Sequence, residues 1–168
     1  MLPEGSDGTD RREPQMSRWR AQIATEAIDL GAAMAQVTSP AHGAVASFVG
    51  QVRDHDPEAS GEVVSLDYSA HPDAGRTIER VVAQTLESLD PTGQTDGVAL
   101  HRVGHLEVGD LALVVVVGSA HRALAFEVCR GVVEAVKHEV PIWKKQHTAD
   151  GAHVWSGLDQ QAVGDGGR

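Results

Sequence analysis

The chain has 168 residues, of which 41% are hydrophobic, and it carries 14 Lys and Arg against 24 Asp and Glu, a formal net charge of −10. This length and hydrophobic content fit one globular domain with a core and exclude a fully disordered protein. The acidic balance argues against broad binding of nucleic acid or anionic membranes, because no basic stripe covers the chain. A focused phosphate pocket remains compatible with this charge.

Cysteine usage and hydropathy predict a cytoplasmic protein. Cys129 is the single cysteine, which excludes an internal disulfide and favours a reducing compartment. It lies in an apolar helical pattern, so we expect a buried structural thiol rather than a nucleophile. Residues 1–14 contain no apolar stretch typical of a secretory signal, and the longest aliphatic run, 111–117, is too short to span a bilayer.

Two polar ends flank one predicted domain at residues 19–156. Residues 1–18 predict a disordered tail, and residues 157–168 predict a flexible tail. The first half of the domain is predicted to contain, in chain order, an edge strand at 21–28, a short helix at 30–37, a strand at 43–50, a mobile loop at 54–61, a strand at 62–69 and a helix at 73–89.

The second half repeats this mixture. It is predicted to contain strands at 98–103 and 111–117 joined through a turn at 104–110, a helix at 121–139 ended by Pro141, and a hairpin of 143–146 and 153–155 around Asp150 and Gly151. Strands and helices mix without regular βαβ alternation. The pattern therefore predicts an α+β fold, a mainly antiparallel sheet packed with two main helices.

Lys137 and Lys144 are the principal candidates for chemistry, because they bracket an apolar segment that contains Pro141. Cations concentrated at apolar-flanked positions of an acidic protein build a local anion site, and a desolvated lysine among other cations becomes reactive. The alternative is that lysines near a helix end only complement the helix dipole.

A second group of cations lies at a predicted strand-to-helix junction, residues 119–122 (SAHR). Free backbone N–H groups favour an anion there, and Arg122 can hold phosphate oxygens in a fork. The alternative is that Ser119 caps the helix while His121 and Arg122 face solvent. Arg53 adds a further cation at a strand tip, and Phe48 is expected in the core, with a pocket wall as the alternative.

Helix length separates these two groups. Arg122 and Lys137 are 15 residues apart, about 22 Å along a continuous helix, so one small substrate can hardly contact both ends. Either there are two sites, or two subunits bring opposite helix ends together. We favour the second interpretation, a homodimer with composite sites.

No metal or cofactor is expected. His101 and His105 flank a predicted turn, and no CxxC, HExxH or clustered carboxylate accompanies them. The chain also lacks a Walker loop, a GxGxxG motif and a G-x-S-x-G nucleophile elbow.

The chain resembles the large, catalytic subunit of molybdopterin synthase, the MoaE family, over about residues 23–155. Four segments carry the resemblance in order and spacing: residues 48–53 (FVGQVR), 100–106 (LHRVGHL) with Gly109 and Asp110, 119–122 (SAHR) and 137–144 (KHEVPIWK). The histidine–arginine junction combined with two lysines seven apart is the specific part of this pattern.

The resemblance implies the MoaE-like α/β hammerhead fold and a sulfurtransferase of molybdenum cofactor biosynthesis. Such an enzyme inserts two sulfurs into cyclic pyranopterin monophosphate and forms the dithiolene of molybdopterin. The sulfur comes from a small ubiquitin-like subunit whose C-terminal Gly-Gly carries a thiocarboxylate. The large subunits form a homodimer with one small subunit at each end, a heterotetramer whose pockets receive residues from both large subunits.

By matching position, Lys137 is the central catalytic lysine and Lys144 the second lysine of the pocket. The resemblance assigns substrate binding to both lysines and to Gln51, Val52, Arg53, His121, Arg122, Lys145 and Gln146. We hypothesise that Lys137 exchanges protons while Lys144 stabilises developing negative charge. Family members often carry a lysine at the position of Gln51 and Arg-Glu at that of Lys145 and Gln146, which puts edge contacts to the substrate in question.

Two other classes of function are alternatives to a sulfurtransferase. A non-catalytic module would bind a ubiquitin-like partner or a phosphorylated metabolite without turnover, but tail docking alone does not require both lysines. A phosphate-ester hydrolase would need a metal site or a nucleophile, and the sequence provides neither.

Overall fold

Strand β6 (Leu111–Ser119) is the central element of the first sheet, and its aliphatic run is buried almost throughout. The structure is a computed structural model that describes residues 18–157. The first sheet has the order β1-β4-β6-β2, formed with β1 (Trp19–Ala24), β4 (Thr95–Arg102) and β2 (Ala44–Gln51). All neighbours are antiparallel except β1 and β4, which are parallel.

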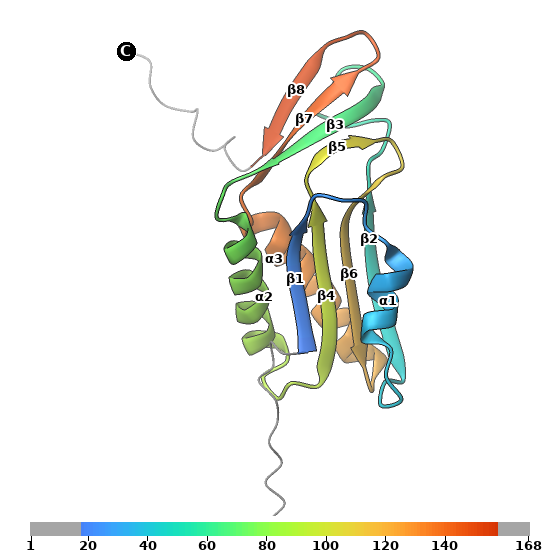
Figure 1. Cartoon of the computed structure of the whole chain (residues 1–168), viewed down its shortest axis with the longest axis vertical. Coiled ribbons are helices and arrows are strands. Elements are labelled where there is room, and N and C mark those ends of the chain that lie inside the picture. The colour runs from blue at the N-terminus through green and yellow to red at the C-terminus, as the bar shows by residue number, and fades with distance from the viewer. Residues whose placement is uncertain (1–17, 158–168) are drawn as a thin grey trace, which may run out of the picture.

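Both faces of this sheet are covered by helices (Figure 1). The helices α2 (Ala74–Leu89) and α3 (Arg122–Glu139) pack on one face, and α1 (Leu30–Val37) packs on the other. Successive side chains of a strand point to opposite faces, so Val115 and Val117 join the core under α2 and α3 while Val114 and Val116 join the core under α1. This two-sided burial explains why β6 is a continuous aliphatic run rather than an alternating one.

The second sheet lies beyond one end of the first (Figure 1). Its order is β5-β3-β7-β8, with bounds Gly104–Glu107 for β5, Val63–Ala70 for β3, Ile142–Thr148 for β7 and His153–Gly157 for β8. All its pairs are antiparallel. A third cluster, Val52, Leu66, Leu106 and Ala112, packs between the two sheets.

The α+β class, the helices and the mainly antiparallel pairing are confirmed. The helix predicted at 30–37 is found with those bounds, and the hairpin turns at Gly151, which has a φ of +83°. The turn predicted at 104–110 was wrong in part, because residues 104–107 form β5 in a second sheet. Gly104 has a φ of +98°, which allows the chain to leave β4 and cross to that sheet.

The predicted tails, apart from Arg18 and Gly157, lie outside the described residues, and Gly157 belongs to β8. Among the helices of residues 18–157, none is long and apolar enough to cross a membrane.

Candidate active site

The two lysines singled out in the sequence line the same cavity. Lys137 lies in the last turn of α3, where Val140 ends the helix and Pro141 prevents its continuation. The chain then reverses into β7, which places Lys144 opposite Tyr68 of β3. The cavity measures about 240 Å³ and is lined by Tyr68, His101, Val136, Lys137, Val140, Ile142, Lys144, Ser156 and Gly157.

Lys137 faces an aromatic ring rather than a carboxylate. Its Nζ lies 5.7 Å from the centroid of the Phe48 ring, which belongs to β2 and packs against the main core. Phe48 is therefore both a core residue and a neighbour of the catalytic candidate. Among residues 18–157, no carboxylate lies within ion-pair distance of Lys137.

Lys144 is held differently. Its Nζ donates to Asp56 Oδ2 at 2.8 Å, and the Asp56 side chain is only 9% exposed. Burial alone raises the pKa of Asp56, but the hydrogen bonds from Lys144 and the Glu58 N–H, with the charges of Lys144 and Arg53, lower it to below the ordinary value. Arg53 thus contributes to the same local field as Lys144.

An uncharged histidine completes the wall between the lysines. His101 Nδ1 lies 2.9 Å from the Arg102 carbonyl oxygen, which only accepts, so Nδ1 carries the proton and Nε2 is left as an acceptor. Burial, followed by the charge of Lys137, lowers the pKa of His101 despite the hydrogen bond to Arg102. The ring packs edge-on against Tyr68 with centroids 5.1 Å apart, and burial followed by the charge of Asp56 raises the pKa of Tyr68.

His121 and Arg122 lie at the opposite end of α3 and are exposed. The backbone N–H of His121 donates to Ser119 Oγ, and neither the His121 nor the Arg122 side chain lines the lysine cavity. Since α3 is one continuous helix, the separation of about 22 Å stands. The structure therefore brings Lys137 and Lys144 to one cavity, with Phe48 beside Lys137, and leaves His121 and Arg122 apart.

The remaining predicted residues differ in exposure. Gln51 is exposed at the end of β2, whereas Val52 is 5% exposed and packs between the sheets. Lys145 points away from Lys144, as expected for neighbours on a strand, and its Nζ lies 5.5 Å from the Trp155 ring centroid. Gln146 is 2% exposed, and its Nε2 has no hydrogen-bond partner among residues 18–157.

Cys129 is unsuited to carry sulfur. It is buried in α3, its Sγ contacts the carbonyl of Val115 at 3.8 Å, and burial raises the pKa of its thiol. A thiol held protonated inside the core is a poor nucleophile.

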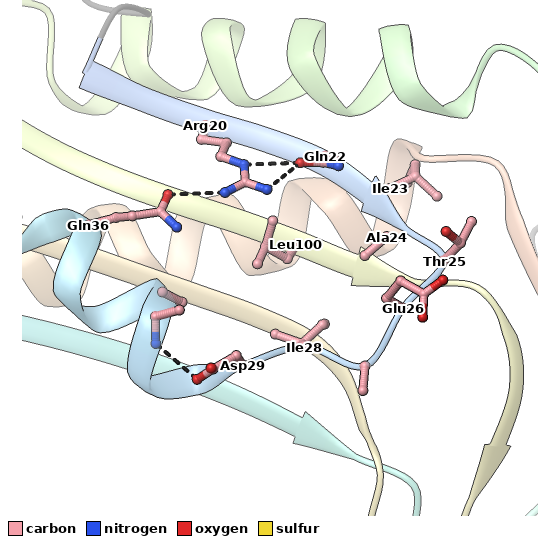
Figure 2. A pocket seen from close by; sticks show the side chains of 13 residues that line it. Arg20, Gln22, Ile23, Ala24, Thr25, Glu26, Ile28, Asp29, Gln36 and Leu100 are labelled. Carbon is pink, nitrogen blue, oxygen red and sulfur yellow. Dashed lines mark hydrogen bonds between the residues drawn. The ribbon is translucent and has the colours of Figure 1, made fainter.

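A second cavity, of about 280 Å³, lies between β1, α1 and the loop that joins them (Figure 2). The guanidinium of Arg20 is occupied there by Gln22, at 2.6 and 3.0 Å, and by Gln36 at 3.3 Å. Glu26 and Asp29 also line it, so among residues 18–157 the cation of Arg20 shares this cavity with two carboxylates. This lining is less suited to an anion than the lysine cavity.

Sequence reasoning missed Asp56, Tyr68 and Ser156 as parts of the site, and it considered His101 only as a metal ligand. Asp56 lies in a segment predicted as a mobile loop, and Tyr68 and Ser156 lie in ordinary strand patterns. The single signal in the sequence was the position of His101 inside a segment that carries the family resemblance. Among the described residues, no group of three or more His, Cys, Asp or Glu is placed to hold a metal ion.

Comparison with known proteins identifies the family. The family model described as MoaE protein matches residues 23–139. Molybdopterin synthase catalytic subunit 1 of Mycobacterium tuberculosis strain H37Rv is 36% identical over 137 residues, which cover 81% of this chain and 89% of that protein.

Solved structures agree with the sequence comparison. The X-ray structure of molybdopterin synthase from Staphylococcus aureus matches with a TM-score of 0.70 and 27% identity, covering 87% of this chain and 99% of that one. The molybdopterin biosynthesis MoaE protein from Burkholderia ambifaria MC40-6 matches with a TM-score of 0.66 and 30% identity, covering 86% and 92%. The chain therefore belongs to the MoaE protein family, whose members include molybdopterin synthase catalytic subunits.

Proposed function

We propose that this chain transfers sulfur from the C-terminal thiocarboxylate of a small ubiquitin-like subunit to cyclic pyranopterin monophosphate, and so forms the dithiolene of molybdopterin. The observation that carries the proposal is the shared cavity of Lys137 and Lys144. Both reactants are anions, and two cations that line one cavity attract an anion there together.

In each transfer, the thiocarboxylate sulfur bonds to a substrate carbon as a carbon–oxygen bond breaks. The departing oxygen leaves as water or as a phosphate oxygen, and Lys137 exchanges the proton that this requires. Hydrolysis of the resulting thioester releases the partner's carboxylate and leaves the sulfur on the substrate. Lys144 stabilises the negative charge that develops on the oxygen.

The buried thiol of Cys129 supports delivery of sulfur by a partner. It is the single cysteine of the chain, and it lies in the core rather than in the lysine cavity. The sulfur therefore has to arrive on another molecule, which is the part we assign to the small subunit.

A composite site in a dimer accounts for the presence of candidate substrate-binding residues at both ends of α3. We propose that the chain forms a homodimer in which His121 and Arg122 of one copy bind the substrate phosphate and pterin beside Lys137 and Lys144 of the other. One small subunit at each end gives a heterotetramer. We place this assembly in the cytoplasm, where the cysteine remains reduced.

The test is reconstitution with a thiocarboxylated small subunit and cyclic pyranopterin monophosphate, followed by fluorescence of the oxidised product. Wild type is expected to form product, and Lys137→Ala is expected to bind the small subunit normally and form none. Arg130→Ala, which removes an exposed cation from the same helix, is the matched control and should remain active. No product from folded, partner-bound wild type would instead favour a non-catalytic binding module.

A further inference from the structure

The carboxylate of Asp56 is fixed by its own loop before it meets Lys144. Its Oδ1 accepts from the N–H of Glu58 at 2.9 Å, and its carbonyl accepts from the N–H of Ala59 at 3.1 Å. Such side-chain turns are typical of aspartate, and the following Pro57 restricts the backbone further. The base of the loop is closed by the N–H of Val63, which donates to the Asp54 carbonyl at 2.8 Å.

The second carboxylate oxygen is thereby aimed at Lys144. Oδ2 lies 2.8 Å from Nζ, and the exposed fractions are 9% for the Asp56 side chain and 27% for that of Lys144. A charge-assisted hydrogen bond with little access to water is stronger than an exposed ion pair. The sequence separation of 88 between the partners shows that the tertiary fold, rather than local sequence, builds this pair.

The two lysines of the cavity are consequently unlike. Lys144 is a held ammonium, whereas Lys137 has an aromatic ring and the uncharged His101 as neighbours and no ion pair within the described part of the chain. An amine that must exchange protons needs freedom to lose its charge, and a group that stabilises an anion needs a fixed charge and position.

We propose that Asp56 is a positioning residue of the sulfur-transfer site. Asp56 holds Lys144 as a fixed cation, and proton exchange is therefore carried out by Lys137. This inference rests on the proposed function. The opposite role, a built-in anion that competes with substrate for Lys144, fits less well, because the turn at Asp56 anchors the carboxylate independently of the lysine.

The first experiment needs no substrate. The free protein is treated with acetic acid N-hydroxysuccinimide ester, and acetylation of each lysine is followed by mass spectrometry, with Lys145 as the internal reference. In the wild type, Lys144 should react more slowly than Lys145. In Asp56→Asn, which keeps the acceptor for Glu58 but removes the charge, acetylation of Lys144 relative to Lys145 should rise about tenfold, since hydrogen bonds to charged groups are the strong ones.

The second experiment is the reconstituted assay with Asp56→Asn. The proposal predicts a kcat about tenfold lower with KM changed by less than about twofold, because a misplaced cation affects the transition state more than binding. The control is Asp54→Asn, which removes an exposed carboxylate of the same loop and should leave both constants unchanged.

The outcomes separate the alternatives. A lower KM with unchanged kcat in Asp56→Asn would overturn the proposal in favour of a competing anion, and unchanged labelling and kinetics would overturn it outright. If wild type makes no product, the proposed function fails, while labelling still decides whether Asp56 holds Lys144. If Asp56→Asn does not fold, the ratio of Lys144 to Lys145 labelling in the wild type remains decisive, because a ratio near one contradicts a held ammonium.

Discussion

The ammonium nitrogen of Lys137 lies 5.7 Å from the centroid of the Phe48 ring, although the two residues come from α3 and β2. The aromatic face attracts the cation by about 0.5–1 kcal/mol at a site open to water, much less than a buried carboxylate does. The contact can therefore orient Lys137 at the cavity wall without holding it as tightly as Asp56 holds Lys144.

Phe48→Leu is expected to lower the rate of product formation about two- to fivefold, which corresponds to the loss of a cation–π contact. Phe48 also packs against the main core, so the same variant should have a slightly lower melting temperature. Phe48→Tyr keeps the ring and should stay close to wild type in rate. Equal rates for Phe48→Leu and wild type would show that the ring does not orient the lysine.

Composite sites can be tested by mixing two inactive variants, Lys137→Ala and Arg122→Ala, after dissociating and reassociating their dimers. Half of the randomly formed dimers contain one copy of each variant. If sites combine residues of two copies, each mixed dimer has one intact site, and activity should recover to about one quarter of wild type. Sites built within one copy would give no recovery.

Local sequence patterns predicted the helices and the central strand well. The apolar spacing of α3 and the aliphatic run of β6 are properties of contiguous residues, and α1 even has the expected bounds. Three strands of the second sheet were predicted, but β5 and the grouping of these strands into a separate sheet were not, because β5 is only four residues long and its pairing with β3 joins segments about 40 residues apart.

The candidate site was also predicted only where its residues are close in sequence. Lys137 and Lys144 are close in sequence and stood out as cations beside apolar residues and Pro141. Tyr68 and His101 line the cavity and Asp56 contacts Lys144, all from segments far from the two lysines, and nothing in their own neighbourhoods indicates a shared site. Physically, the missing information is strand pairing between distant segments, which places β3 beside β7.

An exposed network on the second sheet should make stability depend on pH. His105 donates to Asp67 at 2.9 Å and lies 3.0 Å from Glu107, and His147 lies 2.6 Å from Asp67. The hydrogen bonds to Asp67 and Glu107 raise the pKa of His105. Those from His147 and His105 lower the pKa of Asp67.

The raised pKa of His105 and the lowered pKa of Asp67 determine how the folding stability changes with pH. Because the folded protein binds the His105 proton more tightly than the unfolded chain, the stabilisation is full below the unfolded value of about 6.5 and is lost as pH rises through the raised folded value. The Asp67 contribution is present above about pH 4 and is lost as pH falls through its lowered value.

We therefore expect the melting temperature of wild type to exceed that of His105→Gln at pH 6 and the difference to shrink at pH 8.5, as measured by calorimetry. His101→Gln is the internal contrast. Since the pKa of His101 is lowered, the wild-type histidine weakens the fold on acidification, and the difference between wild type and this variant should change in the opposite direction. A pH-independent difference for His105→Gln would contradict the network.

Gly97→Ala is expected to destabilise the first sheet, because a Cβ at this position of β4 would overlap the Trp19 ring of β1. Trp19 has little room to move, since it is buried and its Nε1 donates to Thr95 Oγ1 at 3.2 Å. Overpacking of this kind costs about 1–3 kcal/mol, which should lower the melting temperature by about 3–10 °C. Gly75→Ala, in the first turn of α2 with open space around its Cβ, is the matched control and should raise it slightly, because alanine favours the helix. Equal melting temperatures for Gly97→Ala and wild type would mean that β1 and β4 separate easily enough to admit the methyl group, which their parallel pairing from Trp19 to Ala24 argues against.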